Sequence, residues 1–373
     1  MTGQTAATPT AAPVEPTAPS TNAPAQATAT VAGPTATATN AATATTEPSP
    51  TVAPPTATAT MQPMAQTWRQ LQATGELPGP RRDHSLTASA DGSLAYLFGG
   101  RSDAGDLGDL WSYDTAQGTW TRIEAGDAPA ARFGHNAAFD SATNRLLVFG
   151  GQSGPTFFDD VWAFDPATSA WSLLASGGPA PRYGAASAFD AIAARFFVSH
   201  GFTNQGRFDD TWAFDPAASA WTDTSSVDGE RPEPRCLVRM ATDDAGQWLW
   251  LFGGQSNSTP FLDDFWAFDV AAHGWQRLDI ERPSARNLYA LTHAVGRMQL
   301  ALYGGNGPDG LKDDVWVFDP GALVWQPVLV EGGSPPPRSG HDMTWLRDSG
   351  VGLVFGGRGP DGDLNDLWEL TLP

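Results

Sequence analysis

Cysteine and lysine are almost absent from this chain, and both absences restrict what it can do. Cys236 is the only cysteine and Lys312 the only lysine among 373 residues. A single thiol cannot form a disulfide framework or a cysteine-based zinc site within the chain. Acidic residues outnumber basic ones by 41 to 21, which gives a formal net charge of −20. Such a surface repels nucleic acid and anionic membranes, so we expect neither as a partner.

Long apolar runs and local catalytic motifs are also missing. No stretch is long and apolar enough to span a bilayer, and no basic segment followed by an apolar one indicates a signal peptide in this sequence. The Gly-x-Ser-x-Gly elbow, the His-Glu-x-x-His motif and the phosphate-binding loop do not occur. We therefore expect no metal, no cofactor and no catalytic residue of these kinds.

The N-terminal segment differs in composition from the rest of the chain. Its first 60 residues are mostly threonine, alanine and proline, with Glu15 and Glu47 as the only charges. Without large apolar side chains, such a segment cannot offset its ordering entropy by burial. We predict a disordered tail or stalk over residues 1–65 and a folded domain over residues 66–373. A stalk favours an extracellular or cell-envelope location, with a cytoplasmic location as the alternative.

Two short patterns recur through the folded part with a period of roughly 50 residues, which is typical of repeat architectures. The first is a glycine pair at the end of an apolar run, at Gly99-Gly100, Gly150-Gly151, Gly253-Gly254, Gly304-Gly305 and Gly356-Gly357, with His200-Gly201 in the remaining copy. The second is an Asp-apolar-Trp unit that begins at Asp109, Asp160, Asp210, Asp264, Asp314 and Asp366 (with Thr211 as the middle residue of the third copy). Each copy reads as four short strands separated by turn residues.

Tryptophan spacing shows how the array closes. A second tryptophan follows the first by nine residues in five copies, as in Trp111 and Trp120, but the last copy has only Trp368. Trp68 stands alone ahead of the first copy. We predict that the strand around Trp68 completes the last sheet and pairs with the strand containing Leu367–Leu370. Closure of this kind removes the exposed edges of an open array.

The glycine doublets, the aromatic residues of the third strand and the tryptophan of the fourth resemble kelch repeats of the galactose-oxidase central-domain type. The resemblance covers about residues 66–371 and implies an all-β fold, a six-bladed β-propeller with four antiparallel strands per blade. It implies little about function, because this fold carries both binding modules and unrelated enzymes. Copper oxidation of the galactose-oxidase kind is not expected, because no tyrosine or histidine adjoins Cys236.

Charged residues also repeat. An arginine precedes the first strand of each copy, at Arg81, Arg132, Arg182, Arg235, Arg286 and Arg338. We expect each to pair with the aspartate of the Asp-apolar-Trp unit as scaffold, since a pair in every blade cannot be specific to one ligand site. Histidines follow the arginine in three copies, at His84, His135 and His341, where they line the core or the central channel or contribute to binding. In the third copy, His200 is expected to distort its blade or to turn into a cavity.

Residues that vary between copies are the better candidates for function, because loops on a rigid scaffold often carry binding residues. The loops after the glycine pairs contribute Arg101, Arg207, Phe261 and Arg358, which we select with His84, His135 and His341 as candidate binding residues. We expect a monomeric, non-catalytic module that binds a protein or glycan ligand. The alternative is a carbohydrate-active or sugar-isomerising enzyme with its site at the channel mouth. The Asp361–Asp366 run has oxygen ligands at alternating positions, as a calcium loop would.

Overall fold

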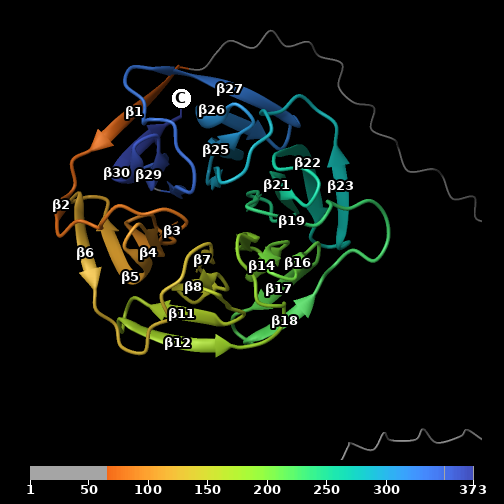
Figure 1. The fold of residues 1–373 in the computed structure, drawn as a ribbon, viewed down its shortest axis with the longest axis horizontal. Helices are drawn as coiled ribbons and strands as arrows, with labels where there is room; N and C mark the ends of the chain where they lie inside the picture. The colour runs from red at the N-terminus through yellow and green to blue at the C-terminus, as the bar shows by residue number, and fades with distance from the viewer. Residues whose placement is uncertain (1–64, 348, 373) are drawn as a thin grey trace, which may run out of the picture. The chain divides into compact units, whose positions relative to one another are not determined.

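The computed structural model describes residues 65–347 and 349–372. Within that part of the chain every regular element is a β-strand, and none is a helix that could cross a membrane. Six blades surround a central axis, as Figure 1 shows in a view along it. The predicted all-β, six-bladed propeller is confirmed. The predicted disordered tail over residues 1–65 lies outside the described residues, except for Ala65, which opens β1 (Ala65–Leu71).

Four strands form each blade, and blades two to six keep the same antiparallel order as the first. The innermost strands are β3 (Ser85–Ala88), β7 (Asn136–Asp140), β13 (Ala186–Asp190), β20 (Arg239–Thr242), β24 (Ala290–Ala294) and β28 (Asp342–Leu346). The second strands are β4 (Leu94–Ser102), β8 (Arg145–Phe149), β14 (Arg195–Ser199), β21 (Trp248–Ser256), β25 (Gln299–Gly307) and β29 (Val351–Gly359).

The outer half of each blade carries the tryptophans. The third strands are β5 (Gly105–Asp114), β11 (Val161–Asp165), β17 (Thr211–Asp215), β22 (Leu262–Asp269), β26 (Gly310–Asp319) and β30 (Gly362–Thr371). The outermost strands are β6 (Thr119–Ile123), β12 (Ala170–Ala175), β18 (Ala220–Asp223), β23 (Gly274–Leu278), β27 (Val324–Glu331) and, in the sixth blade, β1.

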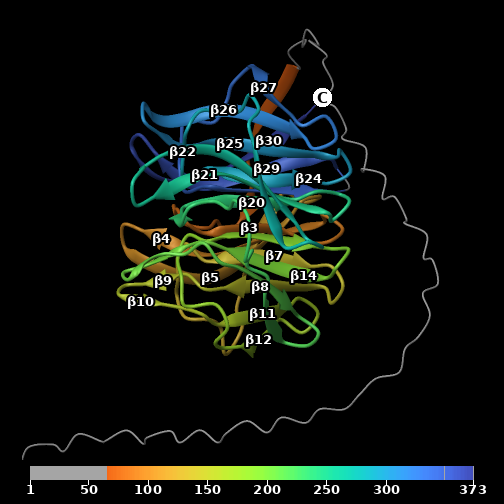
Figure 2. The same ribbon diagram turned by 90° about the vertical axis from the view of Figure 1, so that its right-hand side faces the viewer.

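Short strands extend the turns on one side of the ring. They are β9 (Gln152–Ser153) with β10 (Thr156–Phe157), β15 (Phe202–Thr203) with β16 (Gly206–Arg207), and β19 (Arg235–Cys236) beside β21. A further strand, β2 (Thr74–Gly75), runs parallel to β6 at the rim. We call the side that carries the turns between second and third strands the loop face; in the edge-on view of Figure 2, β9 and β10 mark it on the left.

Strand sequence follows from position in the stack. The second strands are nearly continuous apolar runs, as in Leu146–Phe149, and those four side chains are at most 1% exposed. Both faces of each blade are covered by neighbouring blades, so alternation of apolar and polar residues is not needed there. The core therefore consists of apolar layers between adjacent blades, with each cluster drawing on at least two blades.

A buried arginine joins three parts of every blade. In the second blade, Arg132 donates to both oxygens of Asp160 at 2.7 and 3.0 Å, and to the carbonyl of Gly150 at 2.9 Å. Trp162 Nε1 donates to the same carboxylate at 2.7 Å. Burial opposes the charge on Asp160, but the hydrogen bonds and positive charge of Arg132, with the hydrogen bond from Trp162, together outweigh it and hold the pKa of this carboxyl below its ordinary value. The same bidentate pairing occurs in all six blades, as predicted.

The three predicted histidines are buried between blades. The His135 ring packs edge-on against Phe98 of the first blade at 5.2 Å, and its Nε2 lies 2.9 Å from Ser85 Oγ. His84 packs in the same way on Phe355, and His341 on Tyr303. Burial lowers the pKa of all three imidazoles, so they are neutral at neutral pH. All three lie in the core between blades, and His84 and His135 also border a small void at the axis.

His200 takes the place of the first glycine of a pair without breaking the blade. Its φ is 62°, close to the 67° of Gly150, and β14 pairs with β17 in regular register up to Ser199. The expected distortion is absent from this ladder, and the side chain is fully buried against Trp275. In three of the other blades the corresponding glycine lies under a histidine of the next blade, as Gly99 lies under His135. In the blade after His200, Val238 stands at the position that His135 takes in the second blade. At this junction the histidine is therefore His200 itself, which directly follows the second strand.

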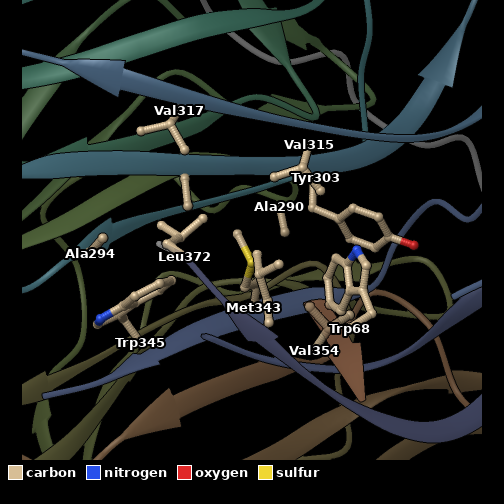
Figure 3. Close-up of a cluster of buried hydrophobic side chains, with 12 residues drawn as sticks. Trp68, Ala290, Ala294, Tyr303, Val315, Val317, Met343, Trp345, Val354 and Leu372 are labelled. Atoms are coloured by element: carbon tan, nitrogen blue, oxygen red, sulfur yellow. The ribbon is translucent and has the colours of Figure 1, made fainter. Parts of the chain in front are cut away.

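The ring closes through the strand at Trp68, as predicted. Trp68 pairs with Leu370 and Gln70 with Trp368 in an antiparallel ladder between β1 and β30. The Trp68 side chain is 7% exposed, and its ring lies 4.9 Å from that of Tyr303 in the fifth blade (Figure 3). The start of β1 also pairs in parallel with β27. One N-terminal strand therefore joins the last two blades into an eight-stranded sheet.

Closure predicts a large effect of one side chain. Trp68→Ala should lower the free energy of unfolding by roughly 3–5 kcal/mol, because it leaves a cavity between two blades. Thr67→Ala, an exposed change in the same strand, should have almost no effect. Removal of residues 1–72 should cause aggregation or a far lower Tm, whereas removal of residues 1–60 should change Tm by no more than about two degrees. Equal stability of the two shortened proteins, measured by thermal unfolding, would contradict this closure.

The arginine pairs predict a second stability effect. Arg132→Ala removes the partner of a largely buried carboxylate, and loss of one partner of such a pair is strongly destabilising. Asp160 keeps 20% side-chain exposure, so we expect a loss of about 2–4 kcal/mol in denaturant unfolding. Arg122→Ala, which breaks the exposed pair with Glu124, should cost at most about 1 kcal/mol. An Arg132→Ala protein of full stability would show that the pair is not scaffold.

Candidate functional site

Aromatic side chains form a row at the loop face over the first three blades. Phe133 is 5% exposed, and the other three, Phe157, Tyr183 and Phe202, are half-buried. Phe133 and Tyr183 meet edge-to-face at 5.4 Å, and Tyr183 is bridged across the backbone to Phe202. Phe157 of β10 meets Phe202 edge-to-face at 6.2 Å. These rings come from the residue after the buried arginine and from the short strands, two positions that the fold brings together in each blade. We call these four residues the aromatic ridge.

An arginine stands at each end of the ridge. Arg101 lies over the Phe133 ring at 4.1 Å, and Arg207 lies over the Phe202 ring at 5.4 Å. Arg101 keeps 39% side-chain exposure, and its nearest carboxylate oxygen, on Asp106, is 4.0 Å away. Guanidinium groups held over aromatic rings offer both apolar and charged contacts to a partner. Two of the predicted binding residues are therefore joined in one surface.

Arg207 is fixed by its neighbours in the fourth blade. Its Nε lies 3.3 Å from Cys236 Sγ, and Nη1 donates to Asn257 Oδ1. Burial raises the pKa of the Cys236 thiol, and Arg207 offsets this only in part. Cys236 is therefore a neutral, buried thiol that positions Arg207 and not a reactive nucleophile. Phe261, the third predicted residue, is partly buried on the turn between β21 and β22, outside the three blades of the ridge.

Arg358 belongs to a second charged group, between the sixth and first blades. Its Nη1 lies 3.2 Å from Asp363 Oδ1 and 3.4 Å from Asp103 Oδ1. Arg82 also donates to Asp363, at 2.6 Å. Asp363 comes from the run considered for calcium, and two arginines occupy its carboxylate. Among the described residues, no group of three or more histidine, cysteine or acidic side chains could hold a metal ion.

Six residues, one in each blade, form a closed ring of backbone hydrogen bonds around the axis. Each N–H donates to the carbonyl of its counterpart in the preceding blade at 2.7–3.2 Å. All six have φ between 53° and 64°, a left-handed conformation that favours glycine. They are Asp83, Gly134, Gly184, Leu237, Leu288 and Gly340. We call this set the axial ring.

The axial ring narrows the channel. A Cβ on Gly134 would lie 2.1 Å from the Tyr183 ring, and one on Gly184 would lie 3.0 Å from Leu237. Tyr183 and Leu237 thus cover ring glycines of the preceding blades. The void beside them is only about 20 Å³, enough for about one water. The ring therefore separates the loop face from the rest of the channel.

Beyond the ring, the channel widens into a cavity of about 610 Å³, which we call the funnel. All six innermost strands line it, together with turns that join them to the second strands, so it faces away from the loop face. Arg239 of β20 and Asp342 of β28 lie in its wall, with Nη2 and Oδ1 3.9 Å apart. His293 of β24 lines the funnel too, with Nε2 3.2 Å from Asp244.

Sequence reasoning selected part of this surface. It found Arg101, Arg207 and Arg358 because they stand in loops that differ between copies. It missed Phe133 and Tyr183, whose signal was the changing residue directly after the repeated arginine. Arg239 and Asp342 also depart from the small or amide side chains at their position in other copies, Ser85, Asn136, Ala186 and Ala290. A comparison of equivalent positions in the six innermost strands would have found Arg239 and Asp342.

Comparison with known proteins adds the family. The model of the KLHDC2/KLHL20/DRC7 Kelch-repeats domain matches residues 53–236 and 223–373. The Rab9 effector protein with kelch motifs of Xenopus laevis is 35% identical over 105 residues, which cover 27% of this chain and 28% of that protein. The acyl-CoA-binding domain-containing protein 4 of Arabidopsis thaliana is 26% identical over 321 residues, 82% of this chain and 47% of that protein. The chain thus spans less than half the length of these relatives.

Asp83 in the axial ring predicts an unusual pH dependence. Burial raises its pKa from 3.8 to about 6, against the opposing charges of Arg82, Arg239 and Arg101. The folded protein therefore binds more protons than the unfolded chain between these values, and stability contributed by this group falls as pH rises from 3.8 to about 6.

Asp83→Asn should remove this dependence, because an amide resembles the protonated carboxyl and also accepts a left-handed φ. The variant should match the natural protein near pH 4 and exceed it at pH 7 by on the order of 2–3 kcal/mol. The aspartates paired with the six buried arginines have lowered pKa values in both proteins, so the difference between the two thermal unfolding curves isolates Asp83. Parallel curves across this pH range would show that Asp83 ionises in the ordinary way.

Proposed function

Since this chain belongs to the KLHDC2/KLHL20/DRC7 kelch-repeat family, we propose that its propeller is a non-catalytic module that binds another protein on the loop face. The observation that carries this proposal is the aromatic ridge with an arginine at each end. Aromatic residues and arginine dominate the binding energy of protein interfaces. The relative named as an effector of Rab9 supports a protein as the ligand.

The ridge also indicates the chemistry of the partner. Arg101 and Arg207 present positive charge on a chain whose formal net charge is −20. A partner segment with apolar side chains between acidic ones would place its apolar groups on the rings and its carboxylates at the arginines. Arg358 and Arg82 extend the same face toward the sixth blade, although Asp363 already neutralises part of their charge. A glycan stacked on the rings is the alternative ligand.

We further propose that residues 1–65 act as a stalk that displays the propeller outside the cell or at the cell envelope. Composition supports this, because a segment rich in proline and threonine favours extended conformations. The propeller is proposed to act as a monomer, with the ridge as the contact surface. These points rest on sequence, since the stalk, apart from Ala65, lies outside the described residues.

Capture of a partner tests the proposal. Immobilised full-length protein, natural or carrying Phe202→Ala with Arg207→Glu, would be exposed to an extract of the source cells and the retained proteins quantified. The ridge variant should bind its specific partner at least roughly thirtyfold more weakly, because hot-spot residues of this kind contribute roughly 2 kcal/mol or more.

A matched control separates binding from folding. Leu323 is 41% exposed on a turn of the opposite face, and its left-handed φ of 54° suits asparagine. Leu323→Asn should retain the partner fully, and all variants should keep their Tm. If the ridge variant retains the partner, the loop-face assignment is wrong. If a glycan array gives ridge-dependent binding and no protein does, the ligand is a glycan.

A further inference from the structure

The funnel is a site separate from the aromatic ridge. It opens on the other face, and the axial ring lies between the two. Its volume of about 610 Å³ falls within the range of roughly 300–1,000 Å³ that is typical of small-molecule pockets. A cavity of this size, lined by six rigid strands, is preformed, so a small ligand would lose little free energy to reordering of the protein.

Two charged side chains meet in the funnel without a close contact between them. Arg239 Nη2 is 3.9 Å from Asp342 Oδ1, beyond hydrogen-bond distance, and its Nε makes only a long contact of 3.4 Å with the Tyr289 carbonyl. Asp342 Oδ2 accepts from the backbone of Leu86 at 2.8 Å, which fixes the carboxylate. The two side chains are 26% and 17% exposed, so solvent reaches the pair.

The gap between Nη2 and Oδ1 suits a hydroxyl group. A hydroxyl oxygen at about 2.8 Å from each atom accepts a hydrogen bond from the guanidinium and donates one to the carboxylate. Both bonds involve a charged partner and are stronger than bonds between neutral groups. An amine lacks the acceptor when it is protonated, and a carboxylate lacks the donor, so a neutral hydroxyl satisfies this pair best.

The other charged side chains of the funnel do not favour a ligand with a net charge. Three further aspartates line it, but each already holds a turn: Asp190 accepts from Ile192 N, Asp243 from Gln247 N and Asp244 from Met298 N. Arg239 and Asp342 compensate one another. An anion would meet the carboxylates, and a cation would meet Arg239 and Arg347.

Unsatisfied polar atoms supply a second observation. Asp190 and Trp345, which line the funnel, are 1% and 4% exposed, yet Asp190 Oδ2 and Trp345 Nε1 have no hydrogen-bond partner. A buried acceptor and a buried donor without partners are costly, and a ligand with several hydroxyls can satisfy such atoms. Phe139 and Phe189 add apolar surface on two adjacent blades, which suits the C–H face of a sugar ring.

We propose that the funnel binds a small, neutral, hydroxyl-rich molecule of the monosaccharide or disaccharide class, with one ligand hydroxyl bridging Arg239 and Asp342. The site is independent of protein binding on the aromatic ridge. It requires no metal and no covalent step.

Ligand-observed saturation-transfer NMR and calorimetry on the full-length protein test this proposal. The probes are D-glucose, D-galactose, D-mannose, their methyl glycosides and the common neutral disaccharides, at up to roughly 10 mM. At least one should bind. Asp342→Asn, which keeps an acceptor for Leu86 N, and Arg239→Met should each weaken that binding at least tenfold. Phe202→Ala, on the other face, should leave it unchanged.

Charged analogues of the sugar test whether the ligand must be neutral, and the second variant covers the case in which one variant does not fold. The matching uronate and amino sugar should bind at least fivefold more weakly than the neutral sugar, and tighter binding of either would overturn the assignment of a neutral ligand. Should Arg239→Met fail to fold, Asp342→Asn decides the result alone. The proposal is wrong if no neutral saccharide binds, if binding survives Asp342→Asn, or if Phe202→Ala abolishes it.

Discussion

The bidentate arginine–aspartate pair is the interaction on which each blade depends. The arginine side chain connects three segments of its blade: the segment before the first strand, the end of the second strand and the beginning of the third. Arg132 does so through its hydrogen bonds to Gly150 and Asp160. A fully buried guanidinium is costly unless most of its donors are satisfied, and here carbonyl and carboxylate oxygens satisfy them. Because the six arginines hold the loop face at six equivalent points, the residues next to them can vary without loss of the fold.

The ring of blades is closed at its outer edge and at its axis by different interactions. At the rim, β1 pairs with β30, and Trp68 packs on Tyr303 across the junction of the last two blades. At the axis, six left-handed residues exchange backbone hydrogen bonds in a ring. Backbone groups can repeat identically in every blade, whereas side chains near a narrow axis cannot all be large. Three of the six ring residues are therefore glycines, and larger residues cover them, as Leu237 covers Gly184 and Tyr183 covers Gly134.

The axial ring has a functional consequence, because it divides the molecule into two chemically different surfaces. Rings and arginines gather on the loop face, where they suit a macromolecular partner. The funnel on the other side is concave and polar, and its dimensions suit a small ligand. The distinctive groups of each surface stand at positions where one copy departs from the others, Tyr183 on one side and Arg239 on the other.

The sequence by itself determined the blade number, the strand order, the pairing of the arginines with the aspartates and the closure at Trp68. These features repeat, and a pattern present in six copies can be read without coordinates because each copy obeys the same local physics of turns and burial. The neutral, buried state of His84, His135 and His341 could not be read in this way. Their spacing does not show which rings they touch, and only the packing of adjacent blades places each ring against an aromatic side chain of its neighbour.

Tertiary structure alone decided which single residues meet. Arg101 and Phe133 are 32 positions apart, and Arg239 and Asp342 are 103 positions apart; their proximity follows from the rotation between blades and not from any local spacing. The sequence also gave no sign that the axis is closed, since a left-handed Asp83, Leu237 or Leu288 resembles any other residue of its type. A closed circle of six blades brings distant residues to one axis, and that geometry exists only once the ring has formed.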